Sequence, residues 1–261
     1  MQILLTGRNA LVGGSTSGIG KAIALKFAQC GANVTLMSRD ESKLQKTLYE
    51  LDNSKGQKHS YIVADFSTFG IFKSIISEYF KVNTVDILVN NTQGPEAGDV
   101  LEKSNSDYQN AFDLLFQTVS FTTLEAVKGM KKKKYGRVIN VSSLTVKEPK
   151  SHLVLSNTIR TALISWSKSL SVEIAADNIT VNSILTGYFD TERLNSLMKS
   201  QAIQKNVSFE SMKENLIRTV PMKRFGKPEE YAYLATFLAS DYASYITGAN
   251  IPIDGGLLKS I

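Results

Sequence analysis

The chain has 261 residues and one cysteine, with 43% hydrophobic and 21% charged residues, proportions that are ordinary for a globular protein. A lone cysteine cannot form an intrachain disulfide, which favours a reducing cytoplasm. Residues 1–14 lack the pattern of a signal peptide, and no apolar run reaches the ~18 residues of a membrane span. The two histidines are too few for the usual His-based metal sites. We therefore expect a cytoplasmic protein with no membrane contact and no metal.

From the N-terminus onward, short β-rich apolar runs alternate with stretches of helical periodicity. The predicted strands are residues 9–12, 33–37, 59–63, 87–89, 137–141, 180–184 and 250–253. The predicted helices are residues 19–30, 41–52, 68–80, 105–131, 152–176 and 228–240. Such alternation is typical of a parallel sheet with helices on both faces. The sequence therefore predicts an α/β fold, a doubly wound Rossmann-type parallel sheet of about seven strands in a three-layer sandwich, formed by residues 1–261 as a single domain.

The first predicted strand runs into a glycine-rich turn that is followed at once by a predicted helix. Gly14, Gly18 and Gly20 form the pattern G-x-x-x-G-x-G. Such a turn brings the backbone close to a pyrophosphate, and the helix that follows directs its free N–H groups at that anion. The residues expected to contact a dinucleotide here are Gly14, Ser15, Ser17, Gly18, Ile19 and Gly20.

The end of the second predicted strand carries the residues that distinguish NADP from NAD. An acid at this place favours the ribose 2′-hydroxyl of NAD, whereas a guanidinium favours the 2′-phosphate of NADP. The chain has both, in Arg39 and Asp40, and they follow Ser38, which can hydrogen-bond either cofactor. Because no acid stands at the strand tip itself, we expect NADP, with NAD as the alternative.

The formal net charge is +6, and the most basic run is residues 130–137, MKKKKYGR. Nucleic-acid binding is one interpretation of this run. The run is short, lacks interleaved aromatic residues and leads straight into an apolar strand. We therefore interpret it as a solvated loop and expect no nucleic-acid partner.

With these motifs in place, the chain resembles the short-chain dehydrogenase/reductase family over nearly its whole length. Besides the glycine turn, the resemblance rests on Ala64-Asp65, Asn90-Asn91-Thr92-Gln93-Gly94, Val141-Ser142-Ser143, Val181 to Gly187, Asp190-Thr191 and Arg224 to Gly256. The family reduces carbonyls or oxidises alcohols with NAD or NADP, and its members are often tetramers. The resemblance implies a substrate-positioning hydroxyl at Ser143. It also implies cofactor contacts at Asp65, Phe66, Asn91, Arg160, Gly187 and Thr191.

The helix predicted over residues 152–176 departs from the family at the residues that carry its chemistry. In the family a Tyr passes the proton, and a Lys one helical turn later lowers the pKa of that Tyr and holds the ribose. Here Ser156 stands at the Tyr position and Arg160 at the Lys position, and about Leu115 replaces an Asn that anchors a proton-carrying water. A serine alcohol is a much weaker acid than a phenol, which titrates at about 10. A guanidinium cannot give up a proton near neutral pH.

Two other side chains are candidates for the missing proton donor. Tyr188 follows the turn beside the expected nicotinamide position. His152 precedes Ser156 by one helical turn and belongs to the residue type that titrates near neutrality. We hypothesise that one of the two donates the proton. Residues 188–221 break the strand–helix rhythm after a strand end, and we interpret them as a substrate lid.

The favoured function is that of an oxidoreductase that transfers a hydride between NADP and a carbonyl or secondary alcohol, with an atypical proton relay. The alternative is a catalytically impaired nucleotide-binding protein that acts as a sensor or a partner subunit, and a third interpretation is an isomerase or lyase step on the same scaffold. Apolar positions lie on more than one face of the long predicted helices 105–131 and 152–176. Together with the resemblance, this predicts a homotetramer or homodimer.

Overall fold

A sheet of parallel strands dominates the computed structural model, which describes residues 2–260. The strands are β1 (Asn9–Gly13), β2 (Asn33–Ser38), β3 (Ser60–Val63), β4 (Ile87–Asn90), β5 (Gly136–Ser143), β6 (Ile179–Thr186) and β7 (Asn250–Ile253). Their order is β3-β2-β1-β4-β5-β6-β7, and every neighbouring pair is parallel. The order reverses direction at β1, so β1 and β4 flank the switch point at which doubly wound sheets bind ligands. This topology confirms the predicted Rossmann-type fold.

The strand boundaries differ from the predicted ones mainly at the strand ends. β7 has the predicted bounds, whereas β5 and β6 continue further at their carboxyl ends, to Ser143 and Thr186. The prediction that His59 begins the third strand was wrong. Its imidazole Nδ1 instead accepts a hydrogen bond from the backbone N–H of Val34 at 3.1 Å, so the ring, rather than its own backbone, meets the neighbouring strand.

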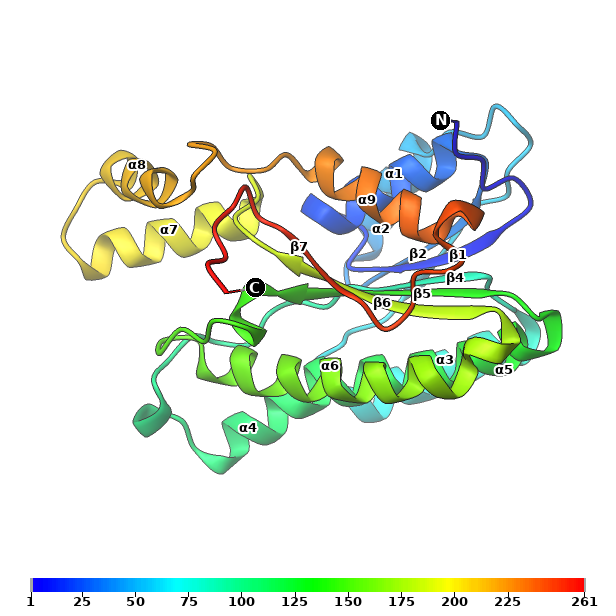
Figure 1. The fold of residues 1–261 in the computed structure, drawn as a ribbon, viewed down its shortest axis with the longest axis horizontal. Coiled ribbons are helices and arrows are strands. Elements are labelled where there is room, and N and C mark those ends of the chain that lie inside the picture. Colours follow the sequence, from blue (N-terminus) through cyan, green and yellow to red (C-terminus); the bar gives the residue numbers. More distant parts are fainter. Residues whose placement is uncertain (1, 261) are drawn as a thin grey trace.

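Helices cover both faces of the sheet, as Figure 1 shows. One face carries α1 (Gly18–Gln29), α2 (Glu41–Glu50) and α9 (Pro228–Ala239). The other carries α3 (Phe69–Val82), α4 (Asn105–Phe112), α5 (Thr118–Lys133) and α6 (Val154–Ile174). Each face has its own cluster of buried apolar side chains, because the strands are buried on both sides.

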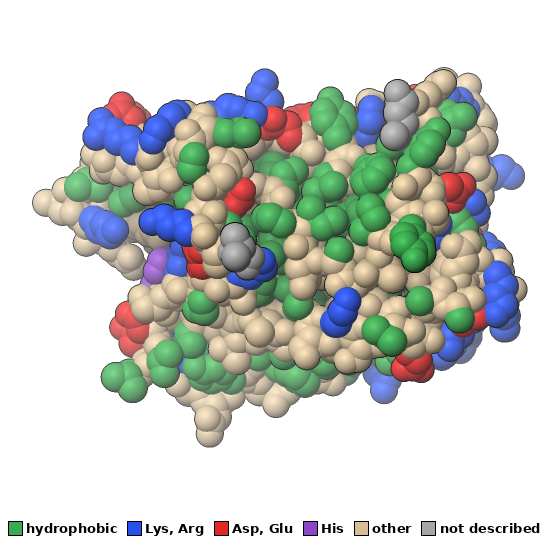
Figure 2. All heavy atoms as spheres, in the orientation of Figure 1, with side chains coloured by type: hydrophobic (Ala, Val, Ile, Leu, Met, Phe, Trp, Pro, Cys, Tyr) green, Lys and Arg blue, Asp and Glu red, His purple; other side chains and the backbone are tan. Residues whose placement is uncertain are grey.

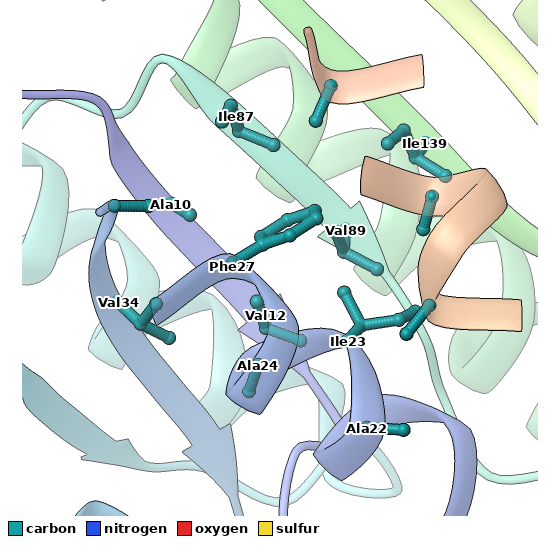
Figure 3. Packing of buried hydrophobic residues seen from close by; sticks show 14 of the residues in the cluster. Ala10, Val12, Ala22, Ile23, Ala24, Phe27, Val34, Ile87, Val89 and Ile139 are labelled. Atoms are coloured by element: carbon teal, nitrogen blue, oxygen red, sulfur yellow. The ribbon is translucent and has the colours of Figure 1, made fainter. Parts of the chain in front are cut away.

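The packing of α1 against the sheet fixes the helix that follows the glycine turn. Ile23 and Phe27 of α1 point toward Val12 and Val89 of the two central strands (Figure 3), and all four side chains are fully buried. Burying a side chain of this size contributes about 1.5–3 kcal/mol. The start of α1 is therefore held in place beside the switch point.

The long helix predicted over residues 105–131 is interrupted, so that prediction was wrong at its centre. A π-helical turn, Asp113–Gln117, separates α4 from α5. Within it the Thr118 hydroxyl donates to the carbonyl of Leu114 at 2.6 Å, and the Asp113 carboxylate accepts from both Gln109 and Gln117. Side-chain bonds that compete with the regular backbone ladder are a usual cause of such irregularities.

The helix predicted to begin at residue 152 begins later. Leu153 is the residue before the first turn of α6, and its N–H bonds to the carbonyl of Lys150 in a preceding turn at 3.0 Å. His152 therefore lies outside the helix, and its side chain is exposed.

Residues 188–221 contain two helices, α7 (Glu192–Gln204) and α8 (Phe209–Thr219), which project from one end of the sheet in Figure 1. Their buried side chains, together with Phe225, form an apolar cluster separate from the two main ones. Figure 2 shows the molecule hollowed between this projection and the segments around α4.

The basic run, residues 130–137, was expected to be a solvated loop. That interpretation was wrong for most of the run, because it forms the end of α5 and the start of β5, although Lys131 to Lys134 are exposed as expected. Lys133 pairs with Asp86 at 2.9 Å, and Lys134 pairs with Asp177. Arg137 is only 1% exposed. Across residues 2–260, no helix combines the length and apolarity that crossing a membrane requires.

Candidate active site

The loops at the carboxyl ends of β1, β4, β5 and β6 bring most of the predicted site residues to one edge of the sheet. Because the strands are parallel and adjacent, their carboxyl ends share that edge. The register pairs Ser143 of β5 directly with Thr186 of β6. The glycine turn after β1, Asn91 after β4 and Gly187 after β6 lie along the same edge.

At the three glycines of the turn, a side chain would clash with its neighbours or strain the backbone. Gly14 and Gly18 have φ angles of 55° and 50°, which glycine adopts without strain. A Cβ on Gly20 would overlap the carbonyl oxygen of Gly14 and lie 2.6 Å from the side-chain amide of Asn91. That amide Nδ2 donates to the carbonyls of Gly13 and Gly14, at 3.1 and 3.4 Å. Asn91 thus holds the turn from the neighbouring strand.

The N-terminus of α1 fits a pyrophosphate. Ser17 is the capping residue, its side chain makes no capping hydrogen bond, and the first turn contains no acid. The free N–H groups and the positive end of the helix are therefore available to an anion. The start of α7 lies close to this turn, since the methyl carbon of its capping residue, Thr191, would lie 3.1 Å from a Cβ on Gly18. Similarly, the guanidinium of Arg193 would lie 3.7 Å from a Cβ on Gly94.

At the adenosine end, the structure separates the roles of Arg39 and Asp40. The Asp40 carboxylate caps α2 by accepting from the backbone N–H of Lys43 at 3.0 Å. Arg39 is exposed and near enough to Asp65 to attract it electrostatically. The Ser38 hydroxyl lies 3.2 Å from that of Thr16, a residue that sequence reasoning missed. The residue free to meet a ribose substituent is therefore the guanidinium, which fits the 2′-phosphate of NADP.

Asp65 and Phe66 lie together after β3, as the resemblance implies. Burial raises the pKa of the Asp65 carboxyl, but hydrogen bonds from the hydroxyl and N–H of Ser67, at 2.7 and 2.9 Å, outweigh it and lower that pKa overall. Phe66 lines a small hollow together with Gly13 and Asn91. The hollow is too small for a purine ring, but the ionised Asp65 carboxylate can accept a hydrogen bond from an exocyclic amino group such as that of adenine.

The Ser143 hydroxyl at the end of β5 is held in one orientation by Thr145. Its hydroxyl oxygen accepts hydrogen bonds from the N–H and the hydroxyl of Thr145, at 3.2 and 3.0 Å. Because the oxygen is occupied as an acceptor, the hydroxyl hydrogen remains free to donate to a substrate. Thr145, which sets this direction, was not predicted.

On α6, the pair that replaces the family's Tyr and Lys forms a hydrogen-bonded unit. Arg160 is buried; its Nε donates to the Ser156 hydroxyl at 3.3 Å, and its Nη1 donates to the carbonyl of Val141 at 2.8 Å. Burial lowers the pKa of the Arg160 guanidinium to about 10, so the group stays charged at neutral pH. Leu115, at the position of the family's Asn, is an apolar, 1% exposed residue of the π-helical turn.

The two candidate proton donors have different surroundings. Tyr188 is half-buried, and its hydroxyl oxygen accepts a hydrogen bond from Nζ of Lys150 at 2.5 Å. The same Nζ lies 4.8 Å from the centroid of the Tyr188 ring. His152 is exposed in the turn before α6. Lys150 was not singled out from the sequence, because only the folded loop brings it to the tyrosine.

A family described as enoyl-(acyl carrier protein) reductase matches residues 14–258 of the chain. The match covers nearly every motif described above. The chain belongs to the short-chain dehydrogenase/reductase family. Membership confirms the predicted family and the predicted class of oxidoreductase.

Among curated relatives of this dehydrogenase/reductase, the NADPH-dependent reductase BacG of Bacillus subtilis (strain 168) is 35% identical, covering 97% of this chain and 99% of BacG. The 3-oxoacyl-[acyl-carrier-protein] reductase FabG of Aquifex aeolicus (strain VF5) is 32% identical over 98% of this chain and all of FabG. Among solved structures, the L-sorbose reductase of Gluconobacter frateurii, complexed with NADPH and L-sorbose, has a TM-score of 0.92 at 28% identity, with both chains fully covered. The predicted NADP preference agrees with the NADPH named for two of these relatives.

Proposed function

We propose that this short-chain dehydrogenase/reductase transfers a hydride between NADPH and a carbonyl, or in reverse from a secondary alcohol. The observation that carries the proposal is the orientation of Ser143. Its oxygen is saturated as an acceptor by Thr145, which leaves one hydroxyl hydrogen for a carbonyl oxygen. A donor aimed at the oxygen on which charge develops lowers the barrier to hydride addition.

The chain's own residues fit the cofactor from end to end. The glycine turn and the N-terminus of α1 would hold the pyrophosphate. Arg39 would hold the 2′-phosphate, because the neighbouring Asp40 carboxylate already caps α2. Arg160 would bind the ribose hydroxyls, and Gly187 and Thr191 would border the carboxamide, as the family resemblance implies. When bound, NADPH supplies the hydride.

The proton relay is the unusual part of the proposal. Ser156 and Arg160 cannot replace a phenol and an ammonium, because the guanidinium stays charged and a serine alcohol is a very weak acid. The proton must therefore come from outside α6. Tyr188 and His152 are the two candidates, and the structure gives only the first a charged hydrogen-bond partner.

The first experiment titrates the purified protein with NADPH and with NADH, followed by nucleotide fluorescence. Tighter binding of NADPH supports the roles of the glycine turn and Arg39. A carbonyl screen then measures NADPH oxidation. Binding without oxidation of any carbonyl would favour the alternative, a nucleotide-binding sensor or partner subunit; binding of neither nucleotide would overturn both.

We also propose that residues 1–261 act as one domain, with residues 188–221 as its lid, and that the protein forms a homotetramer or homodimer. Apolar residues remain on the outer surface of the long helices: Leu124 of α5 is 48% exposed and Val172 of α6 is 72% exposed. Figure 2 also shows hydrophobic side chains gathered on the visible face around α9 and β7. Light scattering of the purified protein measures the assembly directly, and a monomer would contradict the proposal.

A further inference from the structure

Resting on the function proposed above, we infer that Tyr188 donates the proton to the substrate oxygen, and that Lys150 positions its hydroxyl and stabilises the phenolate formed. The two side chains meet at 2.5 Å between Nζ and the hydroxyl oxygen. This is the pairing of a phenol with an ammonium that α6 lacks. The phenol comes from the loop after β6 and the ammonium from the loop after β5, so the pair joins two neighbouring strand ends.

The position of Tyr188 relative to Ser143 follows from the strand register. Ser143 lies beside Thr186 across the β5–β6 ladder, and Tyr188 is two residues further along. With strands about 4.8 Å apart and a rise of about 3.3 Å per residue, the backbones of Ser143 and Tyr188 are about 8 Å apart. Gly187 stays in line with β7, because its N–H bonds to the carbonyl of Ile253 at 3.0 Å. At this backbone separation, side chains from the two strand ends are long enough to reach a common substrate oxygen.

The Tyr188 ring is fixed by packing at the base of the lid. It contacts Phe225 at a centroid distance of 6.3 Å in an edge-to-face arrangement. Leu194 of α7 and Leu216 of α8 pack in the same cluster. Since both lid helices contribute to this cluster, a movement of the lid would also move the Tyr188 ring.

The loop that carries Lys150 is anchored on both sides. The Asn157 side-chain amide, on the first turn of α6 next to Ser156, donates to the backbone carbonyl of Lys150 at 2.7 Å. On the other side, Glu148 accepts from the N–H groups of Lys259 and Ser260 at 2.8 and 2.7 Å. No carboxylate of residues 2–260 lies within ion-pair distance of Lys150. Its charge is therefore available to the tyrosine.

The atoms and electrons of the step balance as follows. A hydride and its electron pair add to the carbonyl carbon, the C=O π electrons move to the oxygen, and that oxygen forms a bond to the proton of the Tyr188 hydroxyl. The carbonyl is reduced to an alcohol and NADPH is oxidised to NADP. The phenolate that remains accepts the hydrogen bond of Lys150 and regains a proton from water. A phenolate beside an ammonium is stabilised by a charge-assisted hydrogen bond.

The other tyrosine near the site is unsuited to this role. Tyr231 of α9 is fully buried, and its hydroxyl donates to the carbonyl of Ile184 at 3.3 Å. Burial raises the pKa of the Tyr231 phenol, so its proton is held more tightly. A substrate cannot reach this hydroxyl without unfolding the β6–α9 contact.

The test compares Tyr188→Phe and Lys150→Met with the full-length wild-type protein, using NADPH with diacetyl, ethyl acetoacetate and L-sorbose. Tyr188→Phe keeps the ring and its packing, so we expect kcat to fall about 100-fold while KM and NADPH binding stay within about twofold. Lys150→Met should lower kcat on the order of 10-fold, and Lys150→Arg should restore most of it. Tyr245→Phe and Lys147→Met, both at exposed positions, are the matched controls and should behave as wild type.

A second readout needs no turnover. In protein labelled with isotope at the tyrosine ring carbons, the Tyr188 signal is the one missing from Tyr188→Phe, and it should shift in Lys150→Met but not in Lys147→Met. An unshifted signal, or a Tyr188→Phe protein with wild-type kcat, would overturn the inference alone. A loss confined to His152→Gln would transfer the role to that histidine. If the wild-type protein binds NADPH but reduces none of the carbonyls, the proposed function fails and the inference fails with it.

Discussion

The cofactor side and the substrate side of this sheet edge differ in what they are made of. Around β1, the cofactor would be met mainly by backbone, in a turn where Gly14, Gly18 and Gly20 leave no space for side chains. Around β5 and β6, the proposed chemistry would depend on side chains, those of Ser143, Tyr188 and Lys150. At such a backbone site no other residue can replace the glycines, because any side chain would be sterically excluded. A proton donor can move to another strand end as long as its atom reaches the same point. The departures from the family, at Ser156, Arg160 and Leu115, accordingly lie outside the glycine turn.

The strongest way to break this comparison is Gly20→Ala. The added Cβ would overlap the Gly14 carbonyl and lie 2.6 Å from the Asn91 amide. We expect overpacking to cost about 1–3 kcal/mol of stability and NADPH binding to weaken about 100-fold or more. Fluorescence titration and denaturant unfolding measure the two effects. In the control Gly70→Ala nothing lies within 4 Å of the new Cβ, so neither stability nor NADPH affinity should fall. Wild-type NADPH affinity in Gly20→Ala would mean that the glycine turn does not bind the cofactor.

Ser143→Ala tests the substrate side next. Loss of the single hydroxyl aimed at the substrate oxygen should lower kcat about 100-fold, with NADPH affinity unchanged. The neighbouring Ser142 is a matched control, because its buried hydroxyl has no hydrogen-bond partner within residues 2–260 and Ser142→Ala should keep full activity. Steady-state kinetics of the two variants decide the matter, and equal losses in both would point to a shared structural effect.

Arg39→Ala probes the charged contact expected at the 2′-phosphate of NADPH. We expect NADPH affinity to fall on the order of 10-fold or more, since a charge-assisted hydrogen bond contributes about 1.5–3 kcal/mol, while NADH affinity stays the same. Asp40→Ala should instead affect stability alone. It removes the α2 cap and should cost about 1 kcal/mol of stability without changing the preference for NADPH. A change of preference in Asp40→Ala would return the ribose contact to that acid.

Restoring the family's residues sharpens the contrast further. If the proton comes from Tyr188, the double variant Ser156→Tyr, Arg160→Lys should gain less than about 10-fold in kcat, because the site already has a donor. Turnover of the wild-type protein and the double variant on the same ketone measures this. A much larger gain would show that α6 still has the geometry for the family's own relay.

The smallest effect concerns an ion pair away from the site edge. Hydrogen bonds from Arg224 lower the pKa of Glu230 to about 2, so the pairing stabilises the folded protein above about pH 4.5, and this stabilisation is lost as the pH falls toward 2. Both side chains are more than one third exposed, and the contribution should be below about 1 kcal/mol. Thermal unfolding of wild type and Glu230→Gln should differ at pH 6 and converge toward pH 3; a constant difference would exclude the linkage.

The sequence predicted the sheet, the order of its elements and the glycine turn well, because these depend on local patterns. Hydrophobic periodicity and a glycine-rich turn can both be recognised from consecutive residues of the sequence. The π-helical turn and the late start of α6 were missed, because they arise from individual bonds, the side-chain bond of Thr118 and the backbone bond of Leu153, that hydrophobic periodicity does not reveal. The partners of the candidate site residues, Thr16, Thr145 and Lys150, were missed because loops fold back over the strand ends, and no spacing in the chain records that approach.

The bonds between Glu148 and the residues near the carboxyl end have a consequence for how this protein can vary. The carboxylate is held by the backbone N–H groups of Lys259 and Ser260, which every residue type except proline provides. The types of these two residues can therefore change without loss of the bonds. The number of residues between β7 and this contact cannot change, because it sets where the two N–H groups lie. An insertion or a deletion there would displace the loop that carries Lys150. The distance between Lys150 and Tyr188 therefore depends on the length of a segment far from the cofactor turn.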